Sequence, residues 1–483
     1  MTRLSTLDAS FLRVETPTAH MHVGWFSMLE LPPGEERLDL AGLLAQIQSR
    51  LHLAPRFRQR LQEPPLPLGE PSWRDDPSFE MERHVTVSDP APIGARRLRE
   101  LTDDFLSEQL PRDRPLWSLL VIPAVERGRA GVIGKVHHAM VDGLAAVELG
   151  LLLFDPAPAP DSSPLAPVVR SPAPGGGPLR VLLDAVADSA LEQFRAARGV
   201  AALSLSPGEA RRVVGTVRRA ALSLADDALR PAPASHLNPP IGPRRTLVKH
   251  RIALPRIERL KQHHGVPLND VVLAITSGAL RRLALAMREP PADLRVMIPV
   301  SVRRPDDEGG GNRITFAFIE LPVAGRDPLL RLYRIQEQTR ELKDSGRIAG
   351  TEMLLRSIGS LPEPFKRRAA RLAASPRLYN ITVSNVPGPR TPLYAASARV
   401  RSIYPVIPIP DGHAVAIGVL TYAGGLHFAA YADPDALPRL SRLPGMIEDS
   451  LTELTMGSGT EAHPARPRRA ASPTRRRREP ARA

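Results

Sequence analysis

A proline- and glycine-rich break, about a third of the way along the chain, limits how the sequence can fold. Between Pro156 and Pro178 there are eight prolines and the triplet Gly175-Gly176-Gly177. Proline lacks a backbone donor and has a fixed φ, so neither a helix nor a central strand continues through such a segment. The chain has 483 residues, more than the roughly 100 to 200 of a typical domain. We therefore interpret the break as a linker between two folded units.

Both sides of this linker alternate between strand-like and helix-like patterns, which predicts layered α/β units. No internal sequence repeat is evident. In the first unit we expect strands over 21–28, 117–123 and 131–136, and helices over 38–50 and 95–109. In the second unit we expect strands over 246–254, 294–300, 314–323, 379–384, 398–404 and a hairpin turning at Gly424-Gly425, and helices over 255–264, after Asn269 and over 437–455.

These patterns divide the chain into four segments. The first domain is expected over 1–154 and the second over 244–456. Between them, 155–243 combines the linker with crossover helices, because apolar residues recur at helical spacing between Leu179 and Arg230. The tail over 457–483 is rich in Pro, Ala and Arg without periodicity, so we expect it to be disordered.

The excess positive charge is concentrated at the C-terminus. The net charge is +14, and eight arginines against one glutamate between Pro464 and Ala483 supply +7 of it. Such a tail favours peripheral association with anionic membranes or lipid inclusions. No helix-turn-helix, RRM or zinc-finger spacing accompanies it, so a specific nucleic-acid partner is not expected. The chain has no cysteine, which excludes disulfides, thiolate metal sites and cysteine nucleophiles.

Neither a secretory signal nor a membrane span is predicted. The first residues carry Asp8 and Glu15 and lack an apolar core. Residues 414–432 contain no Lys, Arg, Asp or Glu, but Gly424-Gly425 divides them into two β-rich runs, as in a hairpin. We therefore expect a cytoplasmic protein, with peripheral contact to the inner membrane or lipid droplets.

Two adjacent histidines follow the strand predicted over 131–136. His137 and His138 stand five and four residues before Asp142, which is followed by Gly143. A histidine at a strand end, with a carboxylate nearby, has the reach and polarity of a general base. A zinc site using His138 and Asp142, or a packed histidine pair in the core, are the alternatives. No HExxH and no second cluster supports a metal, so we expect none; His263-His264 ends a predicted helix before Gly265 and is interpreted as structural.

The segment HHAMVDG resembles the HHxxxDG signature of the coenzyme A-dependent acyltransferase superfamily, which includes chloramphenicol acetyltransferases and peptide-synthetase condensation domains. Further segments, in the same order, resemble the bacterial wax ester synthase/diacylglycerol acyltransferase family over roughly Leu4 to Thr455. These segments are Leu4-Ser5-Thr6-Leu7-Asp8 with Phe11-Leu12, Met21-His22-Val23-Gly24, Pro115-Leu116-Trp117, Asn269-Asp270-Val271-Val272-Leu273-Ala274, Pro299-Val300-Ser301-Val302-Arg303 with Gly311-Asn312, and Ser384-Asn385-Val386-Pro387-Gly388-Pro389.

The resemblance implies a fold and a mechanism. The fold class is α/β, with two chloramphenicol-acetyltransferase-like domains, each a mixed β-sheet flanked by helices, joined by a helical crossover linker. A substrate tunnel lies between the halves, and acyl transfer is direct, without an acyl-enzyme. His138 is the general base and His137 shapes the site, while Asp142 is structural, paired with Arg303, and Gly143 permits a close backbone approach.

Three further motifs receive supporting roles from the same resemblance. Asn269 and Asp270 support the active site, although Asn269 can equally be the N-cap of a helix beginning at Asp270. Pro115, Leu116 and Trp117 line the acceptor side, or form a strand entry with a core tryptophan. Ser384 and Asn385 begin a loop that contacts substrate, or a rigid turn.

The function expected is O-acyl transfer from long-chain acyl-coenzyme A to diacylglycerol or a fatty alcohol. Acyl-coenzyme A is a substrate, and no cofactor is expected. A relative acting on another lipid or polyketide alcohol, and a non-catalytic lipid-surface protein, remain alternatives. The sequence leaves acceptor preference, acyl length and oligomeric state open.

Overall fold

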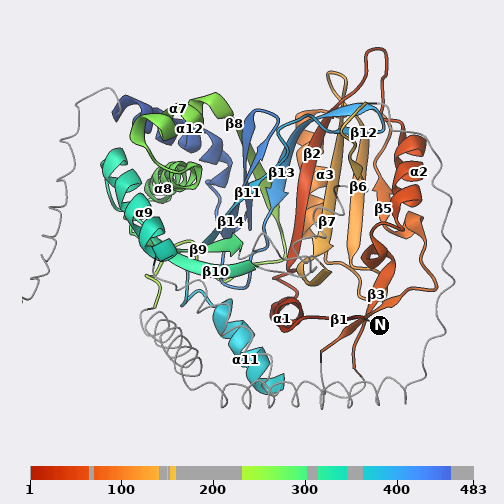
Figure 1. Ribbon diagram of the computed structural model, residues 1–483, viewed down its shortest axis with the longest axis horizontal. Coiled ribbons are helices and arrows are strands. Elements are labelled where there is room, and N and C mark those ends of the chain that lie inside the picture. The colour runs from red at the N-terminus through yellow and green to blue at the C-terminus, as the bar shows by residue number, and fades with distance from the viewer. Residues whose placement is uncertain are drawn as a thin grey trace, which may run out of the picture.

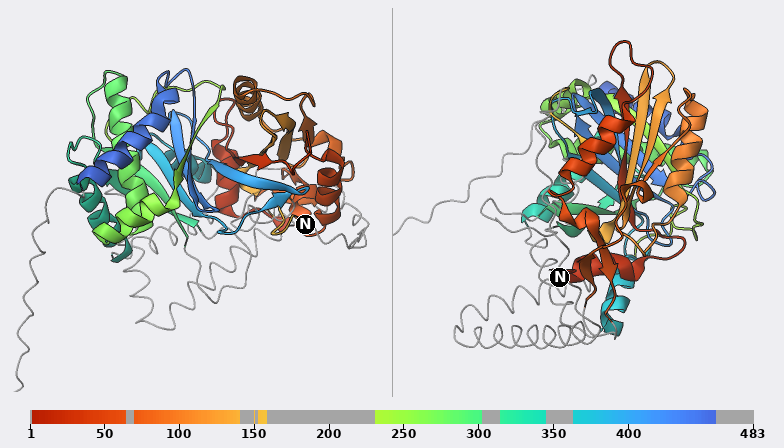
Figure 2. Two further views of the ribbon diagram at one scale, coloured as in Figure 1. Left: turned by 90° about the horizontal axis from the view of Figure 1, so that it is seen from above. Right: turned by 90° about the vertical axis from the view of Figure 1, so that its right-hand side faces the viewer.

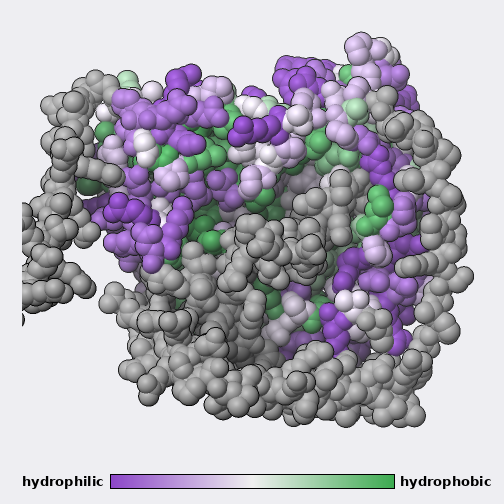
Figure 3. Space-filling view, viewed as in Figure 1, coloured by the Kyte–Doolittle hydropathy of each residue, from purple (hydrophilic) through white to green (hydrophobic). Residues whose placement is uncertain are grey.

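The computed structural model describes residues 2–64, 70–140, 150, 153–158, 231–301, 314–344 and 363–457. Two sheet-containing halves lie side by side (Figure 1). The crossover helices expected over 179–230 and the arginine-rich tail lie outside the described residues. On the face seen in Figure 3, polar residues cover most of the described surface, and hydrophobic residues show mainly between the halves.

The first half is built on a six-stranded mixed sheet. Its order is β12 (Tyr394–Ala395), β13 (Ala398–Val406), β2 (His22–Glu30), β7 (Arg129–His137), β6 (Trp117–Val125) and β5 (Val85–Val87). Neighbours are antiparallel except β5 and β6, which are parallel. Helices α2 (Leu40–Arg50) and α3 (Ala95–Ser107) flank it, and a small sheet of β1 (Thr2–Arg3), β4 (Ser72–Asp75) and β3 (Gln59–Gln62) lies near α1 (Thr6–Val14).

The second half has its own six-stranded mixed sheet. Its order is β10 (Ile314–Leu321), β9 (Leu294–Ser301), β11 (Ile381–Pro387), β14 (Val415–Tyr422), β15 (Gly425–Ala432) and β8 (Thr246–Ala253). Only β9–β11 and β11–β14 are parallel pairs. The helices of this half are α7 (Leu254–His264), α8 (Leu268–Ala286), α9 (Pro328–Asp344), α11 (Glu363–Ala373) and α12 (Leu443–Gly457).

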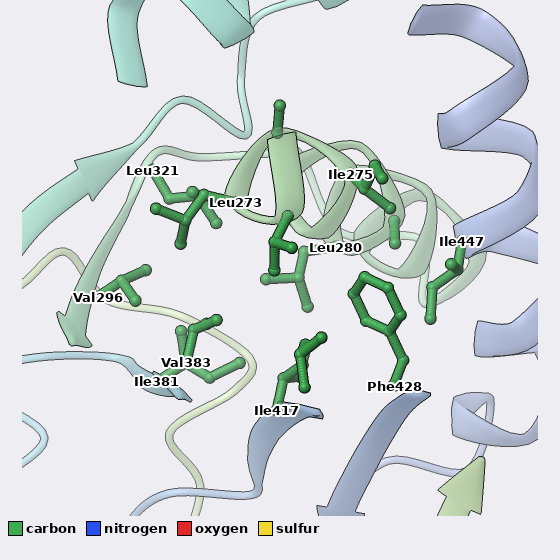
Figure 4. Close-up of a cluster of buried hydrophobic side chains, with 14 of the residues drawn as sticks. Leu273, Ile275, Leu280, Val296, Leu321, Ile381, Val383, Ile417, Phe428 and Ile447 are labelled. Atoms are coloured by element: carbon green, nitrogen blue, oxygen red, sulfur yellow. The ribbon is translucent and has the colours of Figure 1, made fainter. Parts of the chain in front are cut away.

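Helix α8 is the centre of the second core. Its apolar residues extend around most of the helix surface, and Val271 to Ile275 are all buried. Figure 4 shows Leu273 and Leu280 of α8 facing Val296, Val383 and Ile417 of the sheet. Phe428 of β15 and Ile447 of α12 pack at one side of this cluster. A helix that is apolar on nearly all sides has to be covered from several directions. Sheet, α9 and α12 provide this cover.

Strand β13 joins the two halves. It lies within the segment predicted to form the second domain, 244–456, yet it pairs antiparallel with β2 of the first sheet. The predicted boundary therefore does not separate the two sheets. A third apolar cluster lies where they meet, and it includes Phe26, Leu120 and Tyr431. Figure 2 shows this long strand reaching from one half into the other.

The two predicted α/β units with mixed sheets flanked by helices are confirmed. The predicted hairpin of β14 and β15 is present as well, but it turns at Ala423 and Gly424, one residue before the predicted Gly424-Gly425. The prediction missed α1, α9, α11, β5 and the small sheet. In the part of the chain that the structure describes, no helix has the length and apolar character needed to cross a bilayer.

Candidate active site

The two histidines stand at the end of β7, between two neighbouring strands. His137 lies opposite His22 of β2 in the antiparallel register. The His137 amide donates to the Leu116 carbonyl at 2.9 Å, and the His138 amide donates to the Met21 carbonyl at 2.9 Å. A short 3₁₀ turn over His138–Met140 follows. Backbone bonds on both sides therefore fix the point at which the strand ends and the turn begins.

His137 is held in one tautomer. Its side chain is buried, and its Nδ1 accepts a hydrogen bond from the Ala139 amide at 3.0 Å. A neutral imidazole whose Nδ1 accepts a bond carries its proton on Nε2. That Nε2 faces Oε2 of Glu15 at 3.6 Å, slightly too far for a regular hydrogen bond. The ring thus joins the carboxylate of Glu15 to the turn that contains His138.

Glu15, which follows α1, remains an anion in this buried position. Its side chain is only 3% exposed. Gln109 Nε2 donates to Oε1 at 2.8 Å, and the Arg112 guanidinium pairs with Oε2. Burial by itself raises the pKa of the Glu15 carboxyl, but His137, Arg112 and Gln109 together lower it to about 2. Glu15 is therefore charged throughout the physiological pH range.

His138 packs against an aromatic ring of α1. The His138 imidazole and the Phe11 ring are stacked, with centroids 3.7 Å apart and planes inclined by 12°. The His138 Nδ1 is buried and makes no hydrogen bond to any residue that the structure describes. Burial lowers the pKa of His138 to about 4, and the nearby His137 adds to this lowering. The ring is consequently unprotonated, in the base form, near neutral pH.

Two further histidines lie beside this pair on the chain entering β2. His22 is buried, its Nε2 accepts from the Leu110 amide at 3.3 Å, and its ring meets that of His137 edge-on at 6.5 Å. His20 is buried too, with Nε2 at 2.9 Å from the Pro17 carbonyl. Burial lowers the pKa of both rings. Among the described residues, no group of three or more His, Cys, Asp or Glu is arranged to hold a metal ion.

Asp142, Gly143 and Arg303 lie outside the described residues, so the pairing of Asp142 with Arg303 stays a prediction. The residues that sequence reasoning missed are Glu15, Gln109 and Arg112. The only sequence cue for Glu15 is its position directly after the Leu4-to-Leu12 motif. Phe11 belongs to that motif, but nothing in the sequence predicts that it stacks on His138.

Pro115, Leu116 and Trp117 are buried beside the start of the histidine turn. The Trp117 Nε1 donates to the Phe57 carbonyl at 2.8 Å, and its ring stacks on His84 at 4.5 Å. The Leu116 carbonyl accepts the His137 amide. The structure thus gives these residues the core position that was one of the two predicted alternatives. Their backbone supports the end of β7.

Asn269 is not a helix N-cap. Helix α8 begins at Leu268, with Pro267 at the N-cap position, so Asn269 lies in the first turn and this alternative is wrong. Proline needs no donor at this position, which lets the helix start two residues earlier than expected. Asp270 is 1% exposed and accepts from Thr339 Oγ1 of α9 at 3.0 Å. Burial raises the pKa of its carboxyl, and the side chain links α8 to α9.

Ser384 and Asn385 lie on a strand, so the loop predicted over 384–389 is wrong in its first four residues. Strand β11 continues to Pro387, with Ser384 opposite Gly418 and Asn385 opposite Val419 of β14. On its other side β11 pairs with β9 only at Ile381 and Thr382. A proline is tolerated where one edge of a strand is unpaired. The Asn385 Oδ1 is buried and has no hydrogen-bond partner among the described residues.

A hollow of about 750 Å³ opens at the opposite end of β2, bordered by Leu31, Leu38, Val87 and Ala396. His22 begins β2 beside His137, whereas Leu31 follows its last residue. The hollow therefore lies away from the histidine turn and is not part of this site.

The two mixed sheets and the turn that presents His138 define a two-domain acyltransferase of the HHxxxDG class. A model of the wax ester synthase/diacylglycerol acyltransferase catalytic domain matches residues 4–272, and a model of the WS/DGAT C-terminal domain matches residues 310–455. The chain belongs to this family.

Relatives support this family assignment, and solved structures share the fold. A putative diacylglycerol O-acyltransferase of Mycobacterium tuberculosis is 33% identical over 94% of this chain and 90% of its own length. A probable diacylglycerol O-acyltransferase of the same species is 32% identical over 94% and 96%. The structure of the wax ester synthase/diacylglycerol acyltransferase from Marinobacter aquaeolei VT8 matches with a TM-score of 0.68 at 24% identity, covering 95% of this chain and 100% of that one. The first condensation domain of the calcium-dependent antibiotic synthetase matches with a TM-score of 0.58 at 15% identity, covering 94% and 95%.

Proposed function

We propose that the protein transfers an acyl group from acyl-coenzyme A to the hydroxyl of diacylglycerol or a fatty alcohol, giving triacylglycerol or a wax ester. His138 takes the proton of the acceptor hydroxyl while the hydroxyl oxygen attacks the thioester carbonyl carbon. The carbon–sulfur bond then breaks, and the coenzyme A thiolate receives the proton from His138. Atoms and charges balance without any cofactor, since acyl-coenzyme A is itself a substrate.

The observation that carries this proposal is the state of His138. A general base has to be unprotonated before the reaction, and a pKa of about 4 keeps the ring in that form at neutral pH. The same low pKa makes the free ring a weak base. We therefore propose that proton transfer to His138 accompanies the attack of the hydroxyl oxygen.

The remaining site residues receive proposed supporting roles. Asp142, paired with Arg303, and Gly143 would shape the chain after the histidine turn. Asn269 and Asp270 would support the site from the start of α8. Ser384 and Asn385 would contact substrate where β9 and β11 separate, because an unpaired buried amide oxygen such as Asn385 Oδ1 favours a donor from a bound molecule.

The experiment is thiol release from palmitoyl-coenzyme A on adding hexadecanol or dipalmitoylglycerol, detected with a thiol-reactive dye. The chain has no cysteine and gives no background. His138→Ala is expected to reduce alcohol-dependent release by roughly 100- to 10,000-fold. His263→Ala is the matched control, because His263 is an exposed residue of the other adjacent histidine pair.

Near-normal release by His138→Ala would show that another group is the base. Release by the wild type with neither acceptor would refute the proposed acceptors and point to another lipid or polyketide alcohol, or to a non-catalytic lipid-surface protein. The ratio of the two rates measures acceptor preference.

We also propose that the protein works in the cytoplasm, where acyl-coenzyme A is present, and that the arginine-rich tail brings it to anionic membranes or lipid inclusions. Eight arginines stand between Pro464 and Ala483. Deleting these residues is expected to weaken binding to anionic vesicles while leaving turnover of a soluble short-chain alcohol unchanged. Loss of that turnover would show that the tail is not peripheral.

A further inference from the structure

Helix α11 packs against α1, far from it in sequence, and both lie at the lower edge of the molecule in Figure 1. The second view in Figure 2 also shows α11 projecting at this edge, beyond both sheets. The helix therefore has one side against α1 and the opposite side directed away from the sheets.

A buried network of charges fixes the inner side. Arg13 of α1 donates from Nε and Nη2 to the two carboxylate oxygens of Glu363, at 2.8 and 2.7 Å. Glu70 accepts from Arg13 and, at 2.8 Å, from Lys366 Nζ. The side chains of Arg13, Glu70 and Lys366 are 7%, 6% and 9% exposed. Because each charge is paired in a nearly dry position, α11 is held in one orientation.

The outer side of α11 combines exposed apolar and basic residues. Phe365 is 61% exposed and Leu372 is 55% exposed, and their separation of seven residues places them on one face. Arg368 lies between them, one turn from each, and the exposed Arg371 flanks them. Arg367 is also exposed, but it stands two residues from Phe365 and lies on the flank toward Glu363. We call Phe365, Arg368, Arg371 and Leu372 the outer face of α11. This face carries two positive charges and no negative one.

We propose that the outer face of α11 binds the surface of an anionic phospholipid membrane. A helix that presents phenylalanine and leucine beside several arginines is suited to lie in the plane of the headgroups, with the apolar side chains at the acyl boundary. The arginines match the negative surface charge of such a membrane. A protein partner with an apolar groove would not need the two cations of this face, which favours the membrane.

Binding in this orientation places the catalytic turn beside the lipid. Helix α1, to which α11 is paired through Arg13, carries Phe11, and Phe11 stacks on His138. The α1–α11 pair is thus a rigid link between the docking face and the base. A lipid acceptor would reach His138 from the side on which α11 rests.

The test is cosedimentation of the full chain with vesicles of phosphatidylglycerol and phosphatidylcholine, compared with phosphatidylcholine alone. Phe365→Ser combined with Leu372→Ser is expected to weaken binding to the anionic vesicles at least roughly tenfold, because two apolar side chains no longer leave water. Arg368→Gln combined with Arg371→Gln is expected to weaken it by about fivefold per arginine, and more at low salt. Leu330→Ser on α9 is the matched control, since Leu330 is 47% exposed and lies on a different helix.

Several outcomes would overturn the proposal. One is undiminished binding by both double variants; another is binding that disappears only on deletion of 464–483. A change of oligomeric state in the serine variant, seen by size-exclusion chromatography, would show that a second copy covers this face. Vesicle binding is measured without turnover, so its failure leaves the proposed acyl transfer untouched. The rate at which coenzyme A is released when the acyl group is transferred to a soluble short-chain alcohol is expected to stay unchanged in all these variants. An unchanged rate shows that they fold.

Discussion

The carboxylate of Glu15 faces the Nε2 of His137 at 3.6 Å, on the side of the ring opposite to the bond from Ala139. One negative charge therefore lies beside the nitrogen that carries the proton, and one amide donor lies beside the nitrogen that does not. A change of tautomer would place two hydrogens between Nδ1 and the Ala139 nitrogen. The Glu15 carboxylate therefore acts on the turn that presents His138 by fixing the tautomer and orientation of the His137 ring.

Replacing Glu15 by Gln is expected to lower kcat by roughly 10- to 100-fold, the cost of a base displaced by a fraction of an ångström to one ångström. The KM for acyl-coenzyme A is expected to change little, because Glu15 contacts His137 and not substrate. The tautomer is checked by the nitrogen chemical shifts of His137, which are expected to lose their pure Nε2–H character. Glu63→Gln is the control, because Glu63 is 63% exposed and lies 3.7 Å from the same Arg112. Equal kcat in wild type and Glu15→Gln would refute this role.

The pH dependence of kcat/KM is expected to show an acid limb near pH 4. His138 acts unprotonated, and burial lowers its pKa to about 4 in the free enzyme. Activity is therefore present at neutral pH, is retained as the pH falls through the ordinary histidine range near 6.5, and is lost only as it passes through about 4. Short assays after a pH jump separate this titration from acid unfolding. A limb near 6.5 would show that the ring titrates as if exposed.

Removing the Phe11 ring, which stacks on His138, is expected to shift the acid limb of the kcat/KM profile. In Phe11→Ala, water replaces the stacked ring, so the cost of charging the imidazole falls and its pKa rises toward 6.5. The acid limb of kcat/KM therefore shifts upward. Leu12→Ala is the control, since Leu12 also packs on the first core from α1 and has no ring against His138. An acid limb at the same pH in Phe11→Ala and wild type would show that residues other than Phe11 lower the pKa of His138.

The sequence predicted the parts of the fold that depend on local periodicity. The strands β2, β6, β7 and β14 and the helices α2 and α3 were placed within about three residues of their observed ends, and the start of α8 was placed within two residues. His137 and His138 were found for the same reason, because they interrupt a buried strand pattern. The hydrophobic periodicity of such elements can be recognised within a window of about ten to twenty residues.

Contacts between distant segments could not be predicted in this way. Strand β13 shows ordinary strand composition, and nothing in it indicates pairing with β2 across more than 360 residues. The same holds for Glu15 beside His137 and for Glu363 on Arg13, whose partners are fixed only when the chain folds. The predicted loop was wrong over 384–387 because Pro387 and Gly388 suggest a turn, whereas an unpaired strand edge tolerates a proline.

Packing between α8 and α12 offers a test of the second core. A Cβ added at Gly278 would lie 2.1 Å from Ser450 Oγ and 2.9 Å from Ser450 Cβ, and 3.0 Å from Nη2 of the buried Arg331. Both helices are held by the sheet and by α9, so Gly278→Ala is expected to lower the free energy of unfolding by about 1 to 3 kcal/mol, as overpacking does. The measurement is urea unfolding followed by circular dichroism. Adding Ser450→Gly is expected to restore part of the loss by removing the clashing atoms, whereas Gly445→Ala, with open space around its Cβ, is the control. Full stability of Gly278→Ala would mean that α12 can shift away from α8 without cost.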